Sequence, residues 1–203
     1  MKACVVSAIA LLGSLARAQP LSELQLARLL ADDTTRQAAV DRTVALGNGR
    51  LPLLLAWTRK PPPQLNELEQ PRLLIGMADV FGRLKTNEAI PFLIKNIRLH
   101  RTDGLRSNIW MKTTEAVLSE MPAISALTQL GSPALEDLMS AYLRSAPIGD
   151  RVPLIFTISR IGAVTKIPRV REFLMLVRGE ATFERTQAEE GLNLFDGGQL
   201  RAK

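Results

Sequence analysis

Apolar residues recur with the spacing of an α-helix along most of this chain. In the first such segment, Ser22–Ala31, the leucines at positions 26, 29 and 30 fall three and four residues apart, so they share one face of a helix. Ser22 and Gln25 stand three residues apart at its start, which is the pattern of a capping box. The pattern predicts a helix that buries its leucines.

Comparable segments follow, separated by Gly, Asn or Pro. The second helix is expected to be capped by Thr34 or Thr35 and to end at the Gly47–Gly49 turn. Pro61–Pro63 cannot continue a helix and therefore predict a linker. Further helices are expected at 51–60, 71–84, 88–98, 107–120, 123–131, 132–145 and 181–195, with one more pair over 150–179. The sequence therefore predicts an all-α fold.

Prolines precede apolar runs in three similar stretches. These are RLPLLL at 50–55, AIPFLI at 89–94 and KIPRVR at 166–171. Proline is tolerated in the first turn of a helix, because the N–H that it lacks has no partner there, whereas inside a helix it costs about 3 kcal/mol. Each of these prolines is therefore predicted to mark the start of a helix.

The spacing of the prolines indicates a repeat. The interval from Pro52 to Pro91 is close to half of the interval from Pro91 to Pro168, and Pro133 lies near the middle of the longer one. The repeating interval is about 40 residues with one helix pair in each, which falls in the length class of HEAT and armadillo repeats. The alternative is a non-repetitive helical bundle in which the regular spacing of the prolines is a coincidence.

With these motifs the chain resembles HEAT-repeat proteins, most closely the short bacterial type whose second helix often opens with Ala-Ile-Pro-x-Leu. NEAIPFLIKNI carries this motif almost whole, GNGRLPLLLAW and TKIPRVREFL carry degraded forms, and GSPALEDLM a related one. The resemblance covers residues 33–179, about four helix pairs. It implies a right-handed α-solenoid whose second helices line a concave face, with Ser22–Ala31 and 181–195 as capping helices.

The segment at positions 1–18 has the three parts of a secretory signal peptide. Lys2 supplies the positive start, residues 3–15 form an apolar run, and residues 16–18 (Ala-Arg-Ala) fit a cleavage site. We expect a bacterial exported protein, periplasmic or extracellular, whose mature domain spans 19–196 before a frayed tail at 197–203. An N-terminal anchor or a buried first helix is the alternative.

Removal of this segment would change the composition. It carries Cys4, the one cysteine of the chain, and with Lys2 and Arg17 it takes away two of 26 cations, so 24 remain against 20 acids and the net charge falls from +6 to +4. The cations form no basic tail, which argues against nucleic acid as a partner. Beyond this segment no run of about 18 apolar residues occurs, so no transmembrane segment is expected.

Few residue types are left for chemistry. His100 is the one histidine, and without cysteine the mature chain is expected to hold no metal. A glycine-rich phosphate loop is also missing, so we expect no cofactor. Any helical surface supplies carboxylate pairs, and the candidates for acid/base chemistry are Glu67 with Glu69, Glu136 with Asp137, and Glu189 with Glu190.

Partner binding is the more specific hypothesis. Basic residues recur along the expected second helices, where they either face an acidic partner or complement the helix dipole. Aromatic residues, Trp110 among them, are either interface anchors or core residues. The candidate partner-binding residues are Trp57, Arg59, Lys95, Arg98, Tyr142, Arg144, Arg171 and Arg178.

These observations predict a monomeric, non-enzymatic adaptor or scaffold that binds another protein with an acidic surface. The first alternative is an enzyme or cofactor-handling protein that uses carboxylates and arginines in the concave groove. It would require a deep pocket in which carboxylates converge. The second alternative is a cell-envelope protein attracted to acidic polymers.

Overall fold

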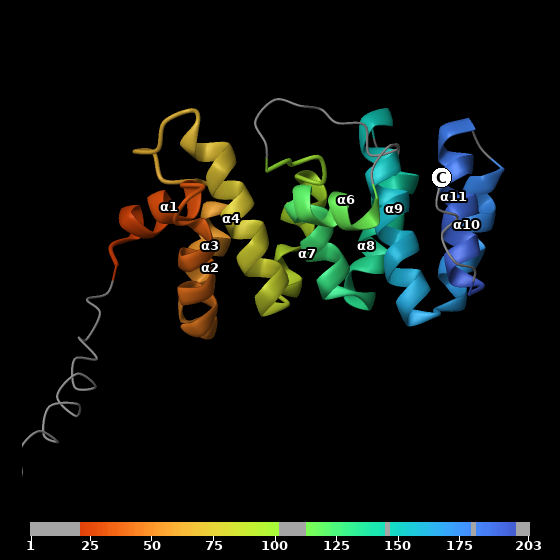
Figure 1. Cartoon of the computed structure of the whole chain (residues 1–203), viewed down its shortest axis with the longest axis horizontal. Coiled ribbons are helices and arrows are strands. Elements are labelled where there is room, and N and C mark those ends of the chain that lie inside the picture. Colours follow the sequence, from red (N-terminus) through yellow and green to blue (C-terminus); the bar gives the residue numbers. More distant parts are fainter. Residues whose placement is uncertain (1–20, 102–112, 145–146, 180–181, 198–203) are drawn as a thin grey trace, which may run out of the picture.

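The computed structural model describes residues 21–101, 113–144, 147–179 and 182–197 (Figure 1). The expected signal peptide, Trp110 and most of the expected tail lie outside these ranges. Within them the chain forms helices, turns and loops and no strand, so the all-α prediction is confirmed. The α-helices are α1 (Glu23–Ala31), α2 (Arg36–Ala45), α3 (Leu51–Trp57), α4 (Glu69–Leu84), α5 (Ile90–Lys95), α6 (Thr114–Glu120), α7 (Pro122–Leu130), α8 (Leu135–Leu143), α9 (Ile148–Thr165), α10 (Pro168–Arg178) and α11 (Thr182–Phe195).

The prolines stand at helix starts, as predicted. Pro52, Pro91 and Pro168 each occupy the first turn of α3, α5 and α10. Pro133 lies in a short 3-10 turn, Ser132–Ala134, that leads directly into α8. In each case the missing N–H falls where a helix has no acceptor for it, so the proline does not break the helix.

The capping box of α1 is confirmed, and Thr35 occupies the N-cap position of α2 as one of the two residues expected there, but its side chain forms no capping bond. Ser22 Oγ accepts from the Gln25 N–H, and Gln25 Oε1 accepts from the Ser22 N–H. Ahead of α2, Asp32 Oδ1 accepts from the N–H groups of Thr34 and Thr35 at 2.9 and 3.0 Å. The Thr35 hydroxyl instead donates to the carbonyl of Leu29. An ionised carboxylate is the stronger acceptor and takes the free donors.

Several helix boundaries differ from the sequence prediction. Helix α4 begins two residues earlier than expected, because Asn66 and Glu69 form a second capping box in which each side chain accepts from the backbone of the other. Helix α5 is shorter than the expected 88–98, since it begins in a 3-10 turn and ends at Lys95. Helix α6 begins at Thr114 behind a Thr113 cap, and the earlier part of the expected 107–120 helix lies outside the described residues.

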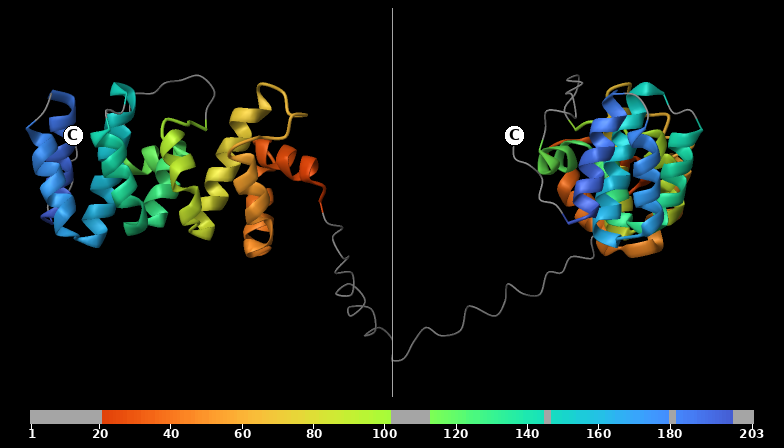
Figure 2. Two further views of the ribbon diagram at one scale, coloured as in Figure 1. Left: turned by 180° about the vertical axis from the view of Figure 1, so that it is seen from behind. Right: turned by 90° about the vertical axis from the view of Figure 1, so that its right-hand side faces the viewer.

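The helices follow one another along the long axis of the molecule and lie in two layers (Figures 1 and 2). In the first-helix layer, made of α4, α7, α9 and α11, each helix packs against the next. In the second-helix layer, made of α5, α8 and α10, α5 contacts α8 and the ring of Tyr142 on α8 meets that of Phe173 on α10. An apolar core runs between the layers from Leu26 to Leu192.

Glycines allow the first-helix layer to pack closely. A Cβ on Gly82 of α4 would lie 2.8 Å from Cα of Ala126 on α7, and a Cβ on Gly76 would lie 2.6 Å from the carbonyl oxygen of Leu30 on α1. Both distances are too short for any side chain, and the obstacle is backbone. Helix α4 therefore approaches both of its neighbours at positions that only glycine permits.

Candidate protein-binding face

Both aromatic residues among the candidates lie in the core. Trp57 is 5% exposed and Tyr142 is 3% exposed. The ring of Tyr142 packs edge-to-face against Phe173, with 5.4 Å between centroids, and the Arg151 guanidinium lies 5.6 Å from its centre on another side. Of the two roles that the sequence left open for these residues, the structure therefore places them in the core.

The six basic candidates are exposed but not equivalent. Arg98 Nε lies 3.9 Å from the Asp150 carboxylate. Arg171 donates to the Asp196 carboxylate at 3.0 Å, a bond that raises the pKa of Arg171. Arg144 donates from Nε to the carbonyl of Ser140 on its own helix. The other three, Arg59, Lys95 and Arg178, form no ion pair with any described residue.

Acidic residues stand in the first turns of three helices of the first-helix layer, and one of them, Asp150, meets the basic candidate Arg98. Glu69, Asp150 and Glu184 each stand in the first turn of α4, α9 or α11, where the helix dipole favours a negative charge. Because each of these helices follows a second helix in the chain, its first turn returns to the edge where that second helix ended. Asp150 meets Arg98, and Glu184 meets Arg151 at 3.6 Å. The edge therefore carries charges of both signs.

Helices α8 and α10 lie in parallel with a defined register. Arg169 on α10 donates to Glu136 on α8, with 2.6 Å between Nη1 and Oε2. The Tyr142–Phe173 contact joins the same two helices further along. These partners are 33 and 31 positions apart in the sequence and occur in the same order on both helices, so corresponding turns of α8 and α10 lie side by side.

Two exposed leucines continue this register. Leu143 follows Glu136 by seven residues and Leu176 follows Arg169 by seven, so each lies about two turns further along the same face of its helix. Both are 59% exposed, and they are 33 positions apart, like the ion pair. We define Leu143 and Leu176, with Arg144 next to Leu143 at the end of α8, as the leucine face; Arg178 lines the concavity between α10 and α11 instead.

The leucine face was missed by the sequence analysis, although a signal was present. On α8 the buried stripe consists of residues 135, 138, 139 and 142, and on α10 of 170, 173, 174 and 177. Leu143 and Leu176 fall outside these stripes. A large apolar residue next to the buried stripe of each helix is the pattern that could have identified them.

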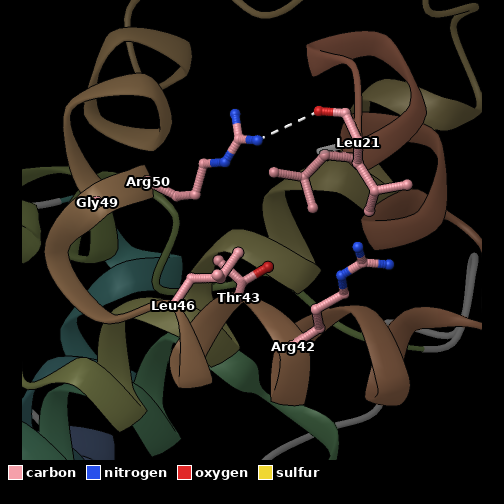
Figure 3. A pocket seen from close by; sticks show the side chains of 7 residues that line it. Leu21, Arg42, Thr43, Leu46, Gly49 and Arg50 are labelled. Carbon is pink, nitrogen blue, oxygen red and sulfur yellow. Dashed lines mark hydrogen bonds between the residues drawn. The ribbon is translucent and has the colours of Figure 1, made fainter. Parts of the chain in front are cut away.

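Two concavities lie at opposite ends of the molecule. One, of about 280 Å³, lies among Leu21 at the start of the described chain, the end of α2 and the turn before α3, and Arg42 and Arg50 reach it from different sides (Figure 3). The other, of about 310 Å³, lies between α10 and α11 and contains the Arg171–Asp196 pair together with Glu189. Glu189 is thus one candidate carboxylate that borders a concavity.

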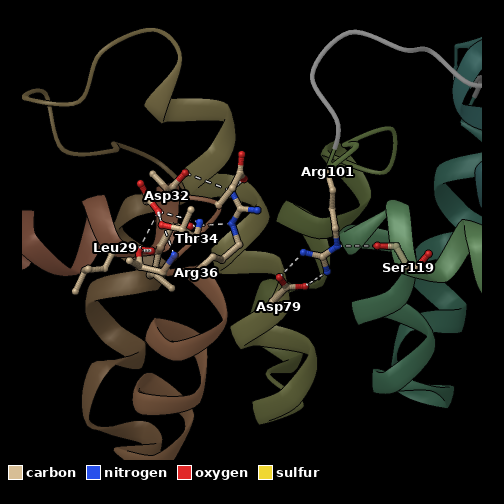
Figure 4. Close-up of polar contacts among 11 residues, drawn as sticks. Leu29, Asp32, Thr34, Arg36, Asp79, Arg101 and Ser119 are labelled. Carbon is tan, nitrogen blue, oxygen red and sulfur yellow. Dashed lines mark hydrogen bonds and ion pairs between the residues drawn. The ribbon is translucent and has the colours of Figure 1, made fainter.

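The remaining polar contacts tie elements together. Arg101, after α5, donates to both oxygens of Asp79 on α4 and to the carbonyl of Ser119 on α6, and the Asp32 cap closes the turn between α1 and α2 (Figure 4). The hydrogen bonds from Thr34 and Thr35 lower the pKa of Asp32.

The described residues contain no group of three or more His, Cys, Asp or Glu placed to hold a metal ion.

Comparison with protein-family models, with curated proteins and with solved structures gave no match to this chain. In the part of the chain that the structure describes, no helix is both long enough and apolar enough to cross a membrane.

Proposed function

We propose that this protein is an exported, HEAT-like α-solenoid adaptor that binds another protein through the leucine face of α8 and α10. The proposal is carried by Leu143 and Leu176, which are both exposed and each follow one member of the Glu136–Arg169 pair between α8 and α10 by two helical turns. Single exposed leucines are ordinary on a protein surface, whereas two exposed leucines on neighbouring helices, one of them next to Arg144, have the composition of an interface.

The solenoid part of the proposal draws on two observations. Four prolines recur at similar intervals along the chain, at the starts of second helices or just before them. Successive first helices also pack in chain order, α4 on α7, α7 on α9 and α9 on α11, which is how repeats with only nearest-neighbour contacts are built. We propose a right-handed superhelix, and a crystal structure that shows a closed bundle or a left-handed array would reject it.

Burial of the two leucines provides a favourable free energy for binding. Complete burial of a leucine side chain is worth about 1.5–3 kcal/mol. Arg144 adds selectivity, because a partner with carboxylates beside its apolar contact pairs with it while a basic partner is repelled. The proposed partner is therefore a protein that presents an apolar residue flanked by acidic residues.

The decisive experiment compares two variants in their capture of proteins from the cell-envelope fraction. Leu143→Asp combined with Leu176→Asp places like charges and no apolar surface on the leucine face. Val164→Asp is the matched control, because Val164 is 83% exposed at the end of α9, away from the ends of α8 and α10. We expect the double variant to lose a protein that the wild type and the control both capture.

A photo-crosslinking residue at position 143 should mark the same protein, and a residue placed at 164 should not. If the double variant captures the same proteins in the same yield as the control, the leucine face is not the binding site. Two further parts of the proposal have their own tests: mass spectrometry of the native protein should find Gln19 at the N-terminus, and sedimentation should give a monomer.

A further inference from the structure

The concavity between α10 and α11 is lined by one face of each helix. We call it the carboxy-terminal pocket; its volume of about 310 Å³ lies at the lower limit of the range of about 300–1,000 Å³ that is usual for ligand pockets. From α10 it is lined by Arg171, Met175 and Arg178, whose spacing places them on the same side of the helix. From the other wall the lining begins at Glu189 on α11 and ends at Asp196. The pocket therefore has cations on one wall and carboxylates on the other.

The ion pair between Arg171 and Asp196 reports the register of the two walls. Arg171, near the start of α10, donates to the carboxylate of Asp196, just after the end of α11, at 3.0 Å, so the two helices run antiparallel. Arg178 follows Arg171 by seven residues, and Glu189 precedes Asp196 by seven, so both lie about two turns away from the ion pair in the same direction. Arg178 and Glu189 consequently border the same end of the pocket.

Arg178 and Glu189 are nevertheless not paired with each other. Both residues are exposed, and neither forms an ion pair or a hydrogen bond with any residue that the structure describes. At the other end of the pocket, by contrast, Arg171 is neutralised by Asp196. One end of the pocket therefore offers a guanidinium and a carboxylate that are both available to a ligand.

Apolar surface lies between the two ends. Met175 is 44% exposed, and its Sδ accepts a hydrogen bond from Nη1 of Arg171 at 3.2 Å, which orients the side chain. Leu192, which is 7% exposed, belongs to the lining from α11, as does the neighbouring amide of Asn193. An apolar group in the pocket would cover Met175, and removing that surface from water favours binding.

We propose that the carboxy-terminal pocket binds a small zwitterion, an α-amino acid with an apolar side chain. Arg178 donates hydrogen bonds to the α-carboxylate, the α-ammonium group donates to Glu189, and the apolar side chain lies against Met175. A ligand with a single charge would pair with one of the two groups and be repelled by the other, whereas a zwitterion pairs with both. This site is separate from the leucine face and does not depend on protein binding there.

The test is an NMR titration of the full chain with L-leucine, followed at the methyl signal of Met175. Two analogues each lack one charge: 4-methylpentanoate has no ammonium group, and 3-methylbutan-1-amine has no carboxylate. We expect leucine to bind at least about tenfold more tightly than either, since each analogue loses a charge-assisted hydrogen bond and meets a like charge. The methyl signal of Met121, which is 3% exposed in the core, should stay in place.

Substitutions of the two charged residues separate their contributions. Arg178→Gln should weaken leucine binding by about tenfold and remove the preference for leucine over 3-methylbutan-1-amine, and Glu189→Gln should remove the preference over 4-methylpentanoate. The matched controls Arg59→Gln and Glu88→Gln, which change exposed residues elsewhere, should leave leucine binding unchanged. The proposal is overturned if either analogue binds the wild type as tightly as leucine does, if Arg178→Gln or Glu189→Gln binds leucine like the wild type, or if leucine does not shift the Met175 signal.

Discussion

The two layers of this molecule are held together by different kinds of contact. In the first-helix layer, backbones approach one another directly, as where Gly82 of α4 meets Ala126 of α7. In the second-helix layer, neighbours touch through side chains, as where Tyr142 meets Phe173. Close backbone contacts therefore align the helices of the first layer, while the second layer leaves apolar residues such as Leu143 and Leu176 exposed.

The comparison predicts the largest loss of stability in the buried seam between the layers. Phe81 on α4 is fully buried and packs against Phe92 of α5, with ring centroids 5.7 Å apart. Phe81→Ala should lower the free energy of unfolding by about 3–5 kcal/mol, because it leaves a cavity. Urea unfolding measures this. Leu176→Ala on the outer face should change stability by less than about 0.5 kcal/mol. Equal losses in both variants would show that the buried contact between the layers contributes no more than the outer face.

A smaller loss is expected from crowding inside the first-helix layer. Gly82→Val would force a side chain against the backbone of Ala126 and should cost about 1–3 kcal/mol. The matched control is Gly49→Val, since nothing lies within 4 Å of a Cβ at Gly49. Chemical denaturation of both variants provides the measurement. If Gly82→Val is as stable as the control, α4 and α7 do not need their close approach.

Breaking an ion pair should likewise cost more stability in the first-helix layer than in the second-helix layer. Asp79, whose side chain is 16% exposed, receives two hydrogen bonds from Arg101. Asp79→Asn should cost about 1–2 kcal/mol, because a partly buried charge loses its partner. Glu136→Gln breaks the Arg169 pair of the second layer, where both side chains are about two-thirds exposed, and should cost less than about 0.5 kcal/mol. Thermal unfolding at low and moderate salt would show a reversed order if this ranking is wrong.

The smallest effect concerns acid. The side-chain hydrogen bond from Arg83, with a second from Gln37, lowers the pKa of Asp41, so folding favours its ionised form. This contribution to stability is present above the ordinary carboxyl pKa of 3.8 and is lost as the pH falls through the lower pKa of the folded state. Asp41→Asn should therefore flatten the acid side of the stability curve. An unchanged pH profile would show that this exposed link between α2 and α4 contributes nothing.

Local features of this fold were predictable because their causes lie within a few residues. Ser22 and Gln25 satisfy each other's backbone, and Pro52 needs no acceptor in the first turn. The same reasoning could have placed the start of α4, since Asn66 and Glu69 repeat the capping-box pattern. The helical periodicity of α4 also agrees with its buried side chains, among them Ile75 and Phe81.

The candidate site was less predictable, because it depends on residues that are distant in the sequence. Arg98 was expected to face a partner, yet Asp150 of α9 lies within 3.9 Å of it. The sequence allowed Tyr142 to be either an interface anchor or a core residue, and its contacts with Phe173 and Arg151 are what place it in the core. The level placement of Leu143 and Leu176 follows from the register of α8 and α10, which the Glu136–Arg169 pair reports and no local pattern contains.

The sequence by itself determined the helices, the capping box of α1 and the interval at which prolines recur, because backbone hydrogen bonding and side-chain periodicity are local. Only the tertiary structure decided which cations are neutralised, which aromatic residues are buried and which leucines stand together on the surface. Those outcomes depend on how helices distant in the sequence are aligned, and that alignment is determined by contacts such as Gly82 with Ala126, between residues 44 positions apart.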